Sequence, residues 1–440
     1  MKVLVINGSP AGKQSVTLQT VLYLRKHFKN AEFEILNAGQ QIKMLEKKFA
    51  CVPAAVRDAD LILFAYPVYT FLVPSQLHRF IELLKENKVD LAGKYAAQIS
   101  TSKHFFDVTA ADFIEDNIFD LGMKYAGALM ADMEDLLKEE GRKQAVQFFE
   151  KVLWKMELGY ADPYLREKKA QETHAAQPMP PRQISGSKKV VIVTDCQSEK
   201  LQSMIDRFRS RLPYESDVFS IREFAFAGGC LGCFHCAKDG TCIYKDGFDA
   251  CLREHIQDHD AIVYAFSIRD HSMGSRFKMY DDRQFCNGHR TVTMGKPVSY
   301  LIDGDLASEE NLAVVLAARG SVGRNVFSFA DNTGDVNAKV DELAETLIYD
   351  LEHDFSQPQN FYGAGGLRIF RDLIYKMQGL MKKDHEFYKE HGFYDFPQKD
   401  KGTLLAGYAI SALVFNDRLN KKVSMRDGML MSYQKVLKEK

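Results

Sequence analysis

The sequence predicts an α/β protein with two doubly wound parallel-sheet domains and a helical C-terminal tail. From residue 1 to about 158, short β-branched segments alternate with amphipathic helical stretches, as in parallel sheets covered by helices. The same alternation restarts at Lys188. The chain of 440 residues is also too long for one hydrophobic core, because domains usually contain roughly 100–200 residues.

The first domain is predicted to span residues 1–160 and to be followed by a linker over residues 161–187. In the linker the periodicity is lost and prolines accumulate. The predicted strands are Val3–Ile6, Phe33–Leu36, Leu61–Ala65, Tyr95–Ser100 and Tyr125–Ala131. The predicted helices are Ser15–Phe28, a segment that ends near Arg57, Ser75–Leu84, Ala110–Leu121 and Met133–Leu158.

A second domain is predicted over residues 188–355 as a diverged copy of the first. Residues 57–65 resemble residues 257–265, and Ala-Gly-Lys before the fourth strand is echoed by Met-Gly-Lys before Val298–Ile302. Two copies of one α/β unit explain these similarities. The alternative is chance similarity, because all buried strands resemble one another.

Residues 356–440 are predicted to form a helical tail rich in Phe, Tyr, Met and Lys. A helix is expected at Leu367–Tyr388. The apolar run Leu404–Phe415 is shorter than the ~20 residues of a membrane span, so it predicts a buried helix. No catalytic motif occurs in the tail, which is expected to pack across the domains or to form an interface in a homo-oligomer.

Charge and cysteine content narrow the class of function. The formal net charge of −1 predicts no general attraction to nucleic acid or to anionic membranes. The sequence opens on a β-like segment without signal-peptide features, so a cytoplasmic location is expected. Five of the eight cysteines lie between positions 230 and 251, which indicates metal or redox chemistry in a reducing compartment.

Two loops of the first domain predict a ligand site. The loop after the first strand, from Asn7 to Thr17, carries Gly-Ser-Pro and leads into a helix, which favours an anion such as phosphate. Its spacing is neither that of a nucleotide P-loop nor that of a dinucleotide fingerprint. The loop after the third strand carries prolines, Tyr69 and Phe71, which offer aromatic surface to a flat ring. Both loops should meet at the carboxyl edge of the sheet.

The second domain contains a C-x2-C-x2-C-x5-C pattern in a glycine-rich loop, formed by Cys230, Cys233, Cys236 and Cys242. This compact spacing favours a 4Fe-4S cluster. Zinc and an empty thiol cluster are the alternatives. Cys51 and Cys286 are expected to be buried or inert thiols, and Cys251 to lie in the core.

The Gly-Ser-Pro loop, the Pro-Val-Tyr loop and the Pro-x-Gln-Leu-x-x-Phe helix resemble the NADPH-dependent FMN reductase and iron-sulfur flavoprotein family. The cysteine spacing and the segment Gly240–Asp246 also resemble this family. The resemblance implies two flavodoxin-like domains in tandem, FMN, a 4Fe-4S cluster and NAD(P)H as co-substrate. It implies that the phosphate is held by Ser9, Ser15 and Thr17, that the isoalloxazine ring is lined by Pro67, Val68, Tyr69, Thr70 and Phe71, and that Ser100, Thr101 and Ser102 face another part of the ring.

The second copy departs from this pattern. Its first loop, Thr194–Glu199, has no glycine and carries two acidic residues, and the loop Phe266–Gly274 lacks Pro-Val-Tyr. These departures predict that the second copy has lost its own FMN. One FMN and one cluster per chain are therefore expected, with the cysteine loop directed toward the flavin loop.

The predicted function is an oxidoreductase without a dedicated catalytic side chain. NAD(P)H or a ferredoxin-type donor would reduce the FMN, and the cluster would pass electrons to a small-molecule acceptor. One alternative is an electron carrier without direct NAD(P)H activity. The other is a non-enzymatic regulatory module that is stabilised by zinc and contains no flavin.

Overall fold

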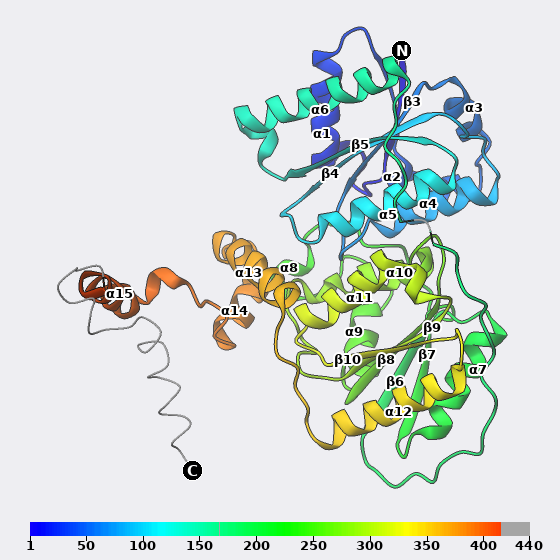
Figure 1. The fold of residues 1–440 in the computed structure, drawn as a ribbon, viewed down its shortest axis with the longest axis vertical. Coiled ribbons are helices and arrows are strands. Elements are labelled where there is room, and N and C mark those ends of the chain that lie inside the picture. The colour runs from blue at the N-terminus through cyan, green and yellow to red at the C-terminus, as the bar shows by residue number, and fades with distance from the viewer. Residues whose placement is uncertain (167, 415–440) are drawn as a thin grey trace. The chain divides into compact units, whose positions relative to one another are not determined.

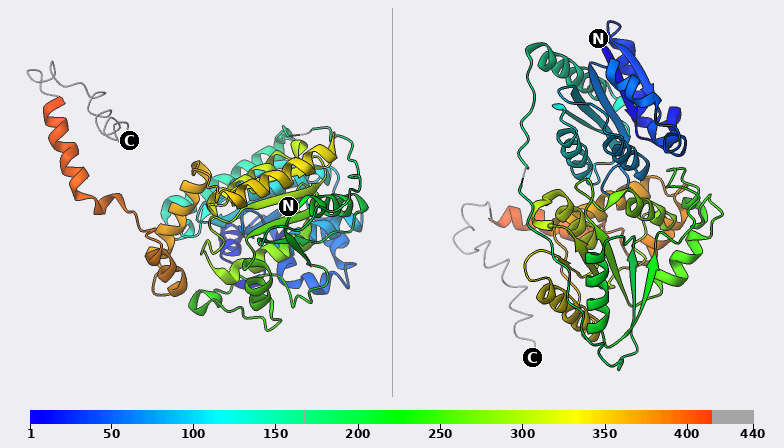
Figure 2. Two further views of the ribbon diagram at one scale, coloured as in Figure 1. Left: turned by 90° about the horizontal axis from the view of Figure 1, so that it is seen from below. Right: turned by 90° about the vertical axis from the view of Figure 1, so that its right-hand side faces the viewer.

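The structure, a computed structural model, describes residues 1–166 and 168–414. The chain divides into two compact units, Met1–His385 and Glu386–Lys440. The first unit contains two parallel sheets with helices on both faces of each (Figures 1 and 2). Within the described residues, the structure has no helix whose length and apolar character would allow it to cross a membrane.

The first sheet is entirely parallel and has the strand order β2-β1-β3-β4-β5. This is the flavodoxin-like order, in which the direction of strand addition across the sheet reverses between β1 and β3. Successive side chains of β1 point to opposite faces of the sheet, so each face has its own hydrophobic cluster. Val3 and Val5 pack on one face, and Leu4 and Ile6 pack on the other. The strands are β1 (Lys2–Asn7), β2 (Glu32–Leu36), β3 (Leu61–Pro67), β4 (Tyr95–Ser102) and β5 (Lys124–Asp132).

Helices cover both faces of this sheet. Residues of α1 and α6 share a core with Val3 and Val5, and residues of α3, α4 and α5 share a core with Leu4 and Ile6. The helices are α1 (Val16–His27), α2 (Ala38–Leu45), α3 (Cys51–Asp58), α4 (Ser75–Glu86), α5 (Asp107–Asp120) and α6 (Glu139–Leu158).

The second sheet repeats this topology. Its order, β10-β9-β8-β6-β7, is the order of the first sheet read from the other end, and every pair of strands is parallel. The predicted α/β class with two flavodoxin-like domains is therefore confirmed. The strands are β6 (Lys189–Thr194), β7 (Glu215–Ser220), β8 (Ala261–Ser267), β9 (Val298–Asp303) and β10 (Phe327–Asp331). The helices are α7 (Glu199–Arg211), α8 (Cys236–Asp239), α9 (Phe248–Leu252), α10 (Gly274–Arg283), α11 (Glu310–Val322) and α12 (Val336–Glu352).

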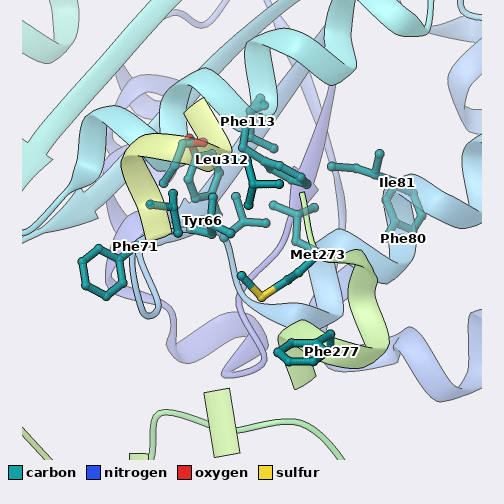
Figure 3. Packing of buried hydrophobic residues seen from close by; sticks show 14 of the residues in the cluster. Tyr66, Phe71, Phe80, Ile81, Phe113, Met273, Phe277 and Leu312 are labelled. Atoms are coloured by element: carbon teal, nitrogen blue, oxygen red, sulfur yellow. Dashed lines mark hydrogen bonds between the residues drawn. The ribbon is translucent and has the colours of Figure 1, made fainter. Parts of the chain in front are cut away.

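The two sheets share one hydrophobic core within the first unit. Tyr66, Phe80 and Phe113 from the first half belong to the same buried cluster as Met273 and Phe277 from the second half (Figure 3). Helix α4 packs against α10, which is its counterpart in the repeat. The same elements of both copies thus face each other, as in an isologous twofold interface.

Two expectations for the tail are wrong. The helix predicted at Leu367–Tyr388 is divided into α13 (Phe361–Lys376) and α14 (Lys382–Glu390) by a turn that contains Gly379, a poor helix former. Helix α15 (Lys401–Val414) forms, but Leu405 and Tyr408 are 70% and 78% exposed rather than buried. The second unit is short, and a short unit buries a smaller fraction of its surface than a full domain does. Phe415 lies outside the described residues.

Candidate functional site

A cavity of about 480 Å³ joins the carboxyl edge of the first sheet to the cysteine loop of the second domain. Its size is within the roughly 300–1,000 Å³ that is typical of small-molecule sites. The predicted residues that line it are Ser9, Ser15, Pro67, Val68, Tyr69, Thr70, Phe71, Thr101 and Ser102 together with Cys230, Cys233, Cys236 and Cys242.

The loop after β1 presents hydroxyl groups at the N-terminus of α1. The Ser9 Oγ accepts a hydrogen bond from the Ala11 amide at 3.3 Å, and the Ser15 Oγ caps α1 by accepting from the Leu18 amide at 3.3 Å. Thr17 does not line the cavity: it is fully buried, and its Oγ1 lies 2.6 Å from the Thr101 Oγ1. Thr17 therefore supports the loop after β4 from behind.

The loop after β3 is a tight turn with an unusual backbone. Tyr69 and Leu72 exchange backbone hydrogen bonds of 2.7 and 3.1 Å. Thr70 and Phe71 have φ values of 45° and 71°, a region that costs non-glycine residues about 1–3 kcal/mol and is frequent at functional sites. The Phe71 ring packs at 5.0 Å from the ring of Phe105. This packing fixes the outer end of the turn.

The loop after β4 completes the first-domain part of the cavity. Thr101 and Ser102 line it, whereas Ser100 is buried and is not a lining residue. The sequence interpretation missed Lys103 and Phe105, which also line the cavity and directly follow the predicted Ser-Thr-Ser segment. It also missed second-domain residues that come from distant segments of the chain, including Phe285, His289 and Arg319.

Buried polar contacts fix the cysteine loop, which connects β7 to α9. The Arg283 guanidinium donates two 2.8 Å hydrogen bonds to the Asp246 carboxylate and one of 2.9 Å to the Gly228 carbonyl. Although burial opposes it, this pairing lowers the pKa of Asp246 from its ordinary value to about 2. From the first domain, the Gln76 Nε2 donates to the Cys230 carbonyl at 3.0 Å. The loop is therefore anchored to both domains.

The cysteine thiols need a positive partner to ionise in this environment. Burial raises the pKa of Cys230 well above its ordinary value and raises that of Cys236 to about 11. Among the described residues, no three of the four predicted ligand sulfurs gather within 4.8 Å.

The other cysteines follow the expectations only in part. Cys286 is buried, and burial raises its pKa to about 12. Cys251 is half-buried on α9. Cys51 is exposed at the start of α3, so of the two expected alternatives, a buried or an inert thiol, the first is wrong for this residue. Its helix turns Val52 and Val56 toward the core instead.

The cysteine loop touches the aromatic loop of the first domain. A Cβ atom placed on Gly232 would lie 1.9 Å from the Tyr69 Oη, so only glycine allows this approach. Gly232 also has a φ of +62°. Burial, followed by the nearby charge of Cys230, raises the pKa of Tyr69 well above its ordinary value. The expected closeness of the two loops is thus present within one chain.

The chain is similar to several known flavoproteins. Residues 1–132 match the family model described as NADPH-dependent FMN reductase. An iron-sulfur flavoprotein of Archaeoglobus fulgidus is 26% identical over 175 residues, which cover 37% of this chain and 79% of that protein.

Among solved structures, an NADH:FMN oxidoreductase in its apo form is 18% identical, with a TM-score of 0.31 over 35% of this chain and 89% of its own. An FMN-dependent NADH-azoreductase from Bacillus anthracis in complex with FMN is 16% identical, with a TM-score of 0.26 over 36% of this chain and 98% of its own.

Proposed function

Because residues 1–132 belong to the NADPH-dependent FMN reductase family, we propose that this flavin-dependent oxidoreductase couples FMN in the first domain to a 4Fe-4S cluster in the second. The electron donor is NAD(P)H or a ferredoxin-type protein, and the acceptor is a small molecule. When bound, FMN exchanges hydride equivalents for single electrons, which an iron-sulfur cluster carries one at a time. The chain supplies binding, orientation and electrostatics for both groups.

In the first domain, the Ser9 and Ser15 hydroxyls and the N-terminus of α1 hold the phosphate group. Thr17 acts through Thr101, which it positions by their 2.6 Å hydrogen bond. The flavin ring would be held by residues that line the cavity, namely Pro67, Val68, Tyr69, Thr70, Phe71, Thr101 and Ser102. Ser100 is buried and does not line the cavity.

In the second domain, Cys230, Cys233, Cys236 and Cys242 ligate the cluster. Their spacing in the sequence and the glycine-rich backbone support this assignment. Arg283 and Asp246 hold the loop in place from the protein side, and Cys233 is its most exposed ligand. The Archaeoglobus fulgidus relative is an iron-sulfur flavoprotein, which supports the same cofactor class.

The observation that carries the proposal is the contact between Gly232 and Tyr69. It places the backbone between two cysteine ligands directly against the tyrosine of the flavin loop. Tyr69 is half-buried where it lines the cavity, and its ring lies 6.1 Å from that of Phe285 of the second domain. Electron transfer between the two groups would therefore need no movement of the domains.

Cofactor analysis of anaerobically purified protein tests the proposal. We expect about one FMN and about four iron atoms with acid-labile sulfide per chain, and flavin bleaching on addition of NADH or NADPH. Bleaching only with reduced ferredoxin would support the electron-carrier alternative. Stoichiometric zinc without flavin or sulfide would refute the proposal and support the regulatory-module alternative.

A further inference from the structure

Three side chains that could bind a metal ion meet at the interface between the two domains, outside the cavity described above. They are His78 and Glu82 of α4 and Asp270 of the loop after β8. One nitrogen or oxygen atom of each lies within 4.8 Å of those of the other two, and among the described residues this is the one such group of three. Two of the ligands come from the first domain and one from the second.

His78 is unusual because both of its ring nitrogens are buried without a hydrogen-bond partner in the described structure. The side chain is fully buried and packs edge-on against Phe113 at 4.7 Å. Its Nε2 lies 3.9 Å from the Glu82 Oε1 and 3.8 Å from the Asp270 Oδ2. These distances are too long for hydrogen bonds, and an unsatisfied buried polar group costs about 1–3 kcal/mol.

The repeat supplies an internal comparison for this site. The counterparts of His78, Glu82 and Asp270 lie 200 positions away: Lys278, Asp282 and Thr70. Both loops have the same backbone form, because Thr70 and Asp270 have φ values of 45° and 50°.

In that second cluster the Lys278 ammonium pairs with Asp282 and donates to the Tyr69 carbonyl at 2.8 Å. The positive charge is therefore provided by the chain. At the first cluster the lysine is replaced by histidine, and a further carboxylate, Asp270, replaces the threonine. One half thus has a lysine ammonium between its polar groups. The other has an additional carboxylate and an unsatisfied imidazole, and its cations, Arg79 and Lys85, pair with the carboxylate oxygens that face away from His78.

We propose that His78, Glu82 and Asp270 bind a zinc-class divalent cation that takes the place of the lysine ammonium. Imidazole with two carboxylates is a ligand set that suits zinc. Ligand atoms at about 2.0–2.2 Å from a tetrahedral zinc ion lie about 3.3–3.6 Å apart. The observed 3.8 and 3.9 Å separations are a few tenths of an ångström wider, so the side chains would close slightly on the bound ion.

Contacts with neighbouring residues orient the carboxylates of Glu82 and Asp270 so that one oxygen of each is directed toward the proposed metal position. The Glu82 Oε2 accepts from Arg79 at 2.9 Å, and the Asp270 Oδ1 accepts from Lys85 at 2.8 Å, so the other oxygen of each faces His78. The Glu82 Oε1 also accepts from the Ser275 amide at 2.7 Å, and its second lone pair remains for the metal. The two side chains are only 11% and 13% exposed. The ion would link α4 of the first domain to the second domain.

Metal binding to the full chain tests this site. All four cluster cysteines are replaced by serine so that the cysteine loop cannot bind the added metal, and the chain is treated with EDTA and then titrated with Zn²⁺ or Co²⁺. We expect about one equivalent to bind, with visible Co²⁺ bands but no near-ultraviolet thiolate band, and a higher Tm in the presence of Zn²⁺.

His78→Lys in the same background should weaken Zn²⁺ binding at least about 100-fold while preserving the fold, because it recreates the lysine ammonium of the other half. The matched control is His259→Lys, which alters a histidine whose Nε2 pairs with the single carboxylate of Asp217 at 3.0 Å, and it should bind Zn²⁺ like the parent. No binding by the parent chain with four serines, or equal binding by its His78→Lys variant, would overturn the proposal.

If the chain with four serines does not fold, zinc content is compared between the cluster-loaded chain and its His78→Lys variant. About one zinc fewer in the variant supports the site, and equal zinc overturns it.

Discussion

The carboxylate of Asp282 on α10 accepts a 2.8 Å hydrogen bond from the backbone amide of Ser75, the first residue of α4. The reverse contact also exists, since Glu82 on α4 accepts a 2.7 Å hydrogen bond from the amide of Ser275 on α10. Each domain thus caps a helix of the other with an acidic residue, which satisfies a backbone donor that the helix itself cannot pair. The two halves stabilise each other through these caps as well as through the shared core.

Asp282→Ala should destabilise the chain by about 3–5 kcal/mol, because it removes the carboxylate that pairs directly with the buried Lys278 ammonium. The next carboxylate, that of Asp281, is 3.7 Å from the ammonium and already pairs with Arg319. Urea unfolding followed by far-UV circular dichroism measures the loss. The double variant Lys278→Met, Asp282→Leu should recover part of it, because no buried charge is left unpaired. A loss below about 1 kcal/mol in the single variant, or a double variant less stable than the single one, would contradict this account.

Ser15→Asp should weaken FMN binding at least about tenfold, or about 1.4 kcal/mol, because it places a negative charge beside the phosphate. Ser15→Asn is the matched control: both asparagine and aspartate can cap α1 as Ser15 does, but asparagine adds no charge. Flavin fluorescence during titration of the apoprotein measures the affinity. Equal weakening in both variants would mean that the hydroxyl itself, rather than the charge at this position, determines binding.

Gly232→Ala should reduce cluster occupancy and flavin–cluster coupling, because the new methyl group would collide with Tyr69. Gly247→Ala separates this effect from backbone strain. Its φ of +77° is as unfavourable to alanine, but nothing lies within 4 Å of the added Cβ. Iron and sulfide analysis of both variants is the measurement. If the two variants lose equal amounts of cluster, the Tyr69 contact has no special role.

The Asp246–Arg283 pair should make a stability contribution that depends on pH. The folded-state pKa of Asp246 lies at about 2, below its unfolded value, so its contribution is present above about pH 4 and is lost as the pH falls toward 2. The free-energy difference between the parent and Asp246→Asn should therefore be largest near neutral pH and shrink on acidification. Urea midpoints at pH 5, 4 and 3 provide the comparison, and a difference that stays constant over this range would be the contrary result.

Both sheets and the loops at the carboxyl edge of the first could be predicted because they depend on local patterns. Strands such as Leu61–Pro67 are continuous apolar runs, and the Gly-Ser-Pro and Pro-Val-Tyr segments follow strands directly. The repeat also follows from comparing segments of one chain. The position of Thr17 behind the cavity could not be predicted, because on a helix only three-dimensional packing decides which side faces a ligand.

The second-domain residues that line the cavity, apart from the cysteines, could not be predicted from local sequence patterns. Phe285 and Arg319 reach the cavity from segments more than 200 residues after Tyr69, and no periodicity encodes which faces of two domains will meet. For the same reason His78 could not be identified as a candidate ligand, because in the sequence it is only a polar residue of an amphipathic helix. In the folded chain His78 is fully buried and faces Asp270 of the second copy, a contact that no local pattern encodes.

The contact between Gly232 and Tyr69 lies within one chain rather than between two subunits. In a homodimer, such a contact would exist only above the dissociation constant, and dilution or subunit exchange would separate its two sides. Here the linking polypeptide keeps both sides at a fixed, high effective concentration. The fraction of molecules with this contact formed should consequently be the same at nanomolar and at millimolar protein.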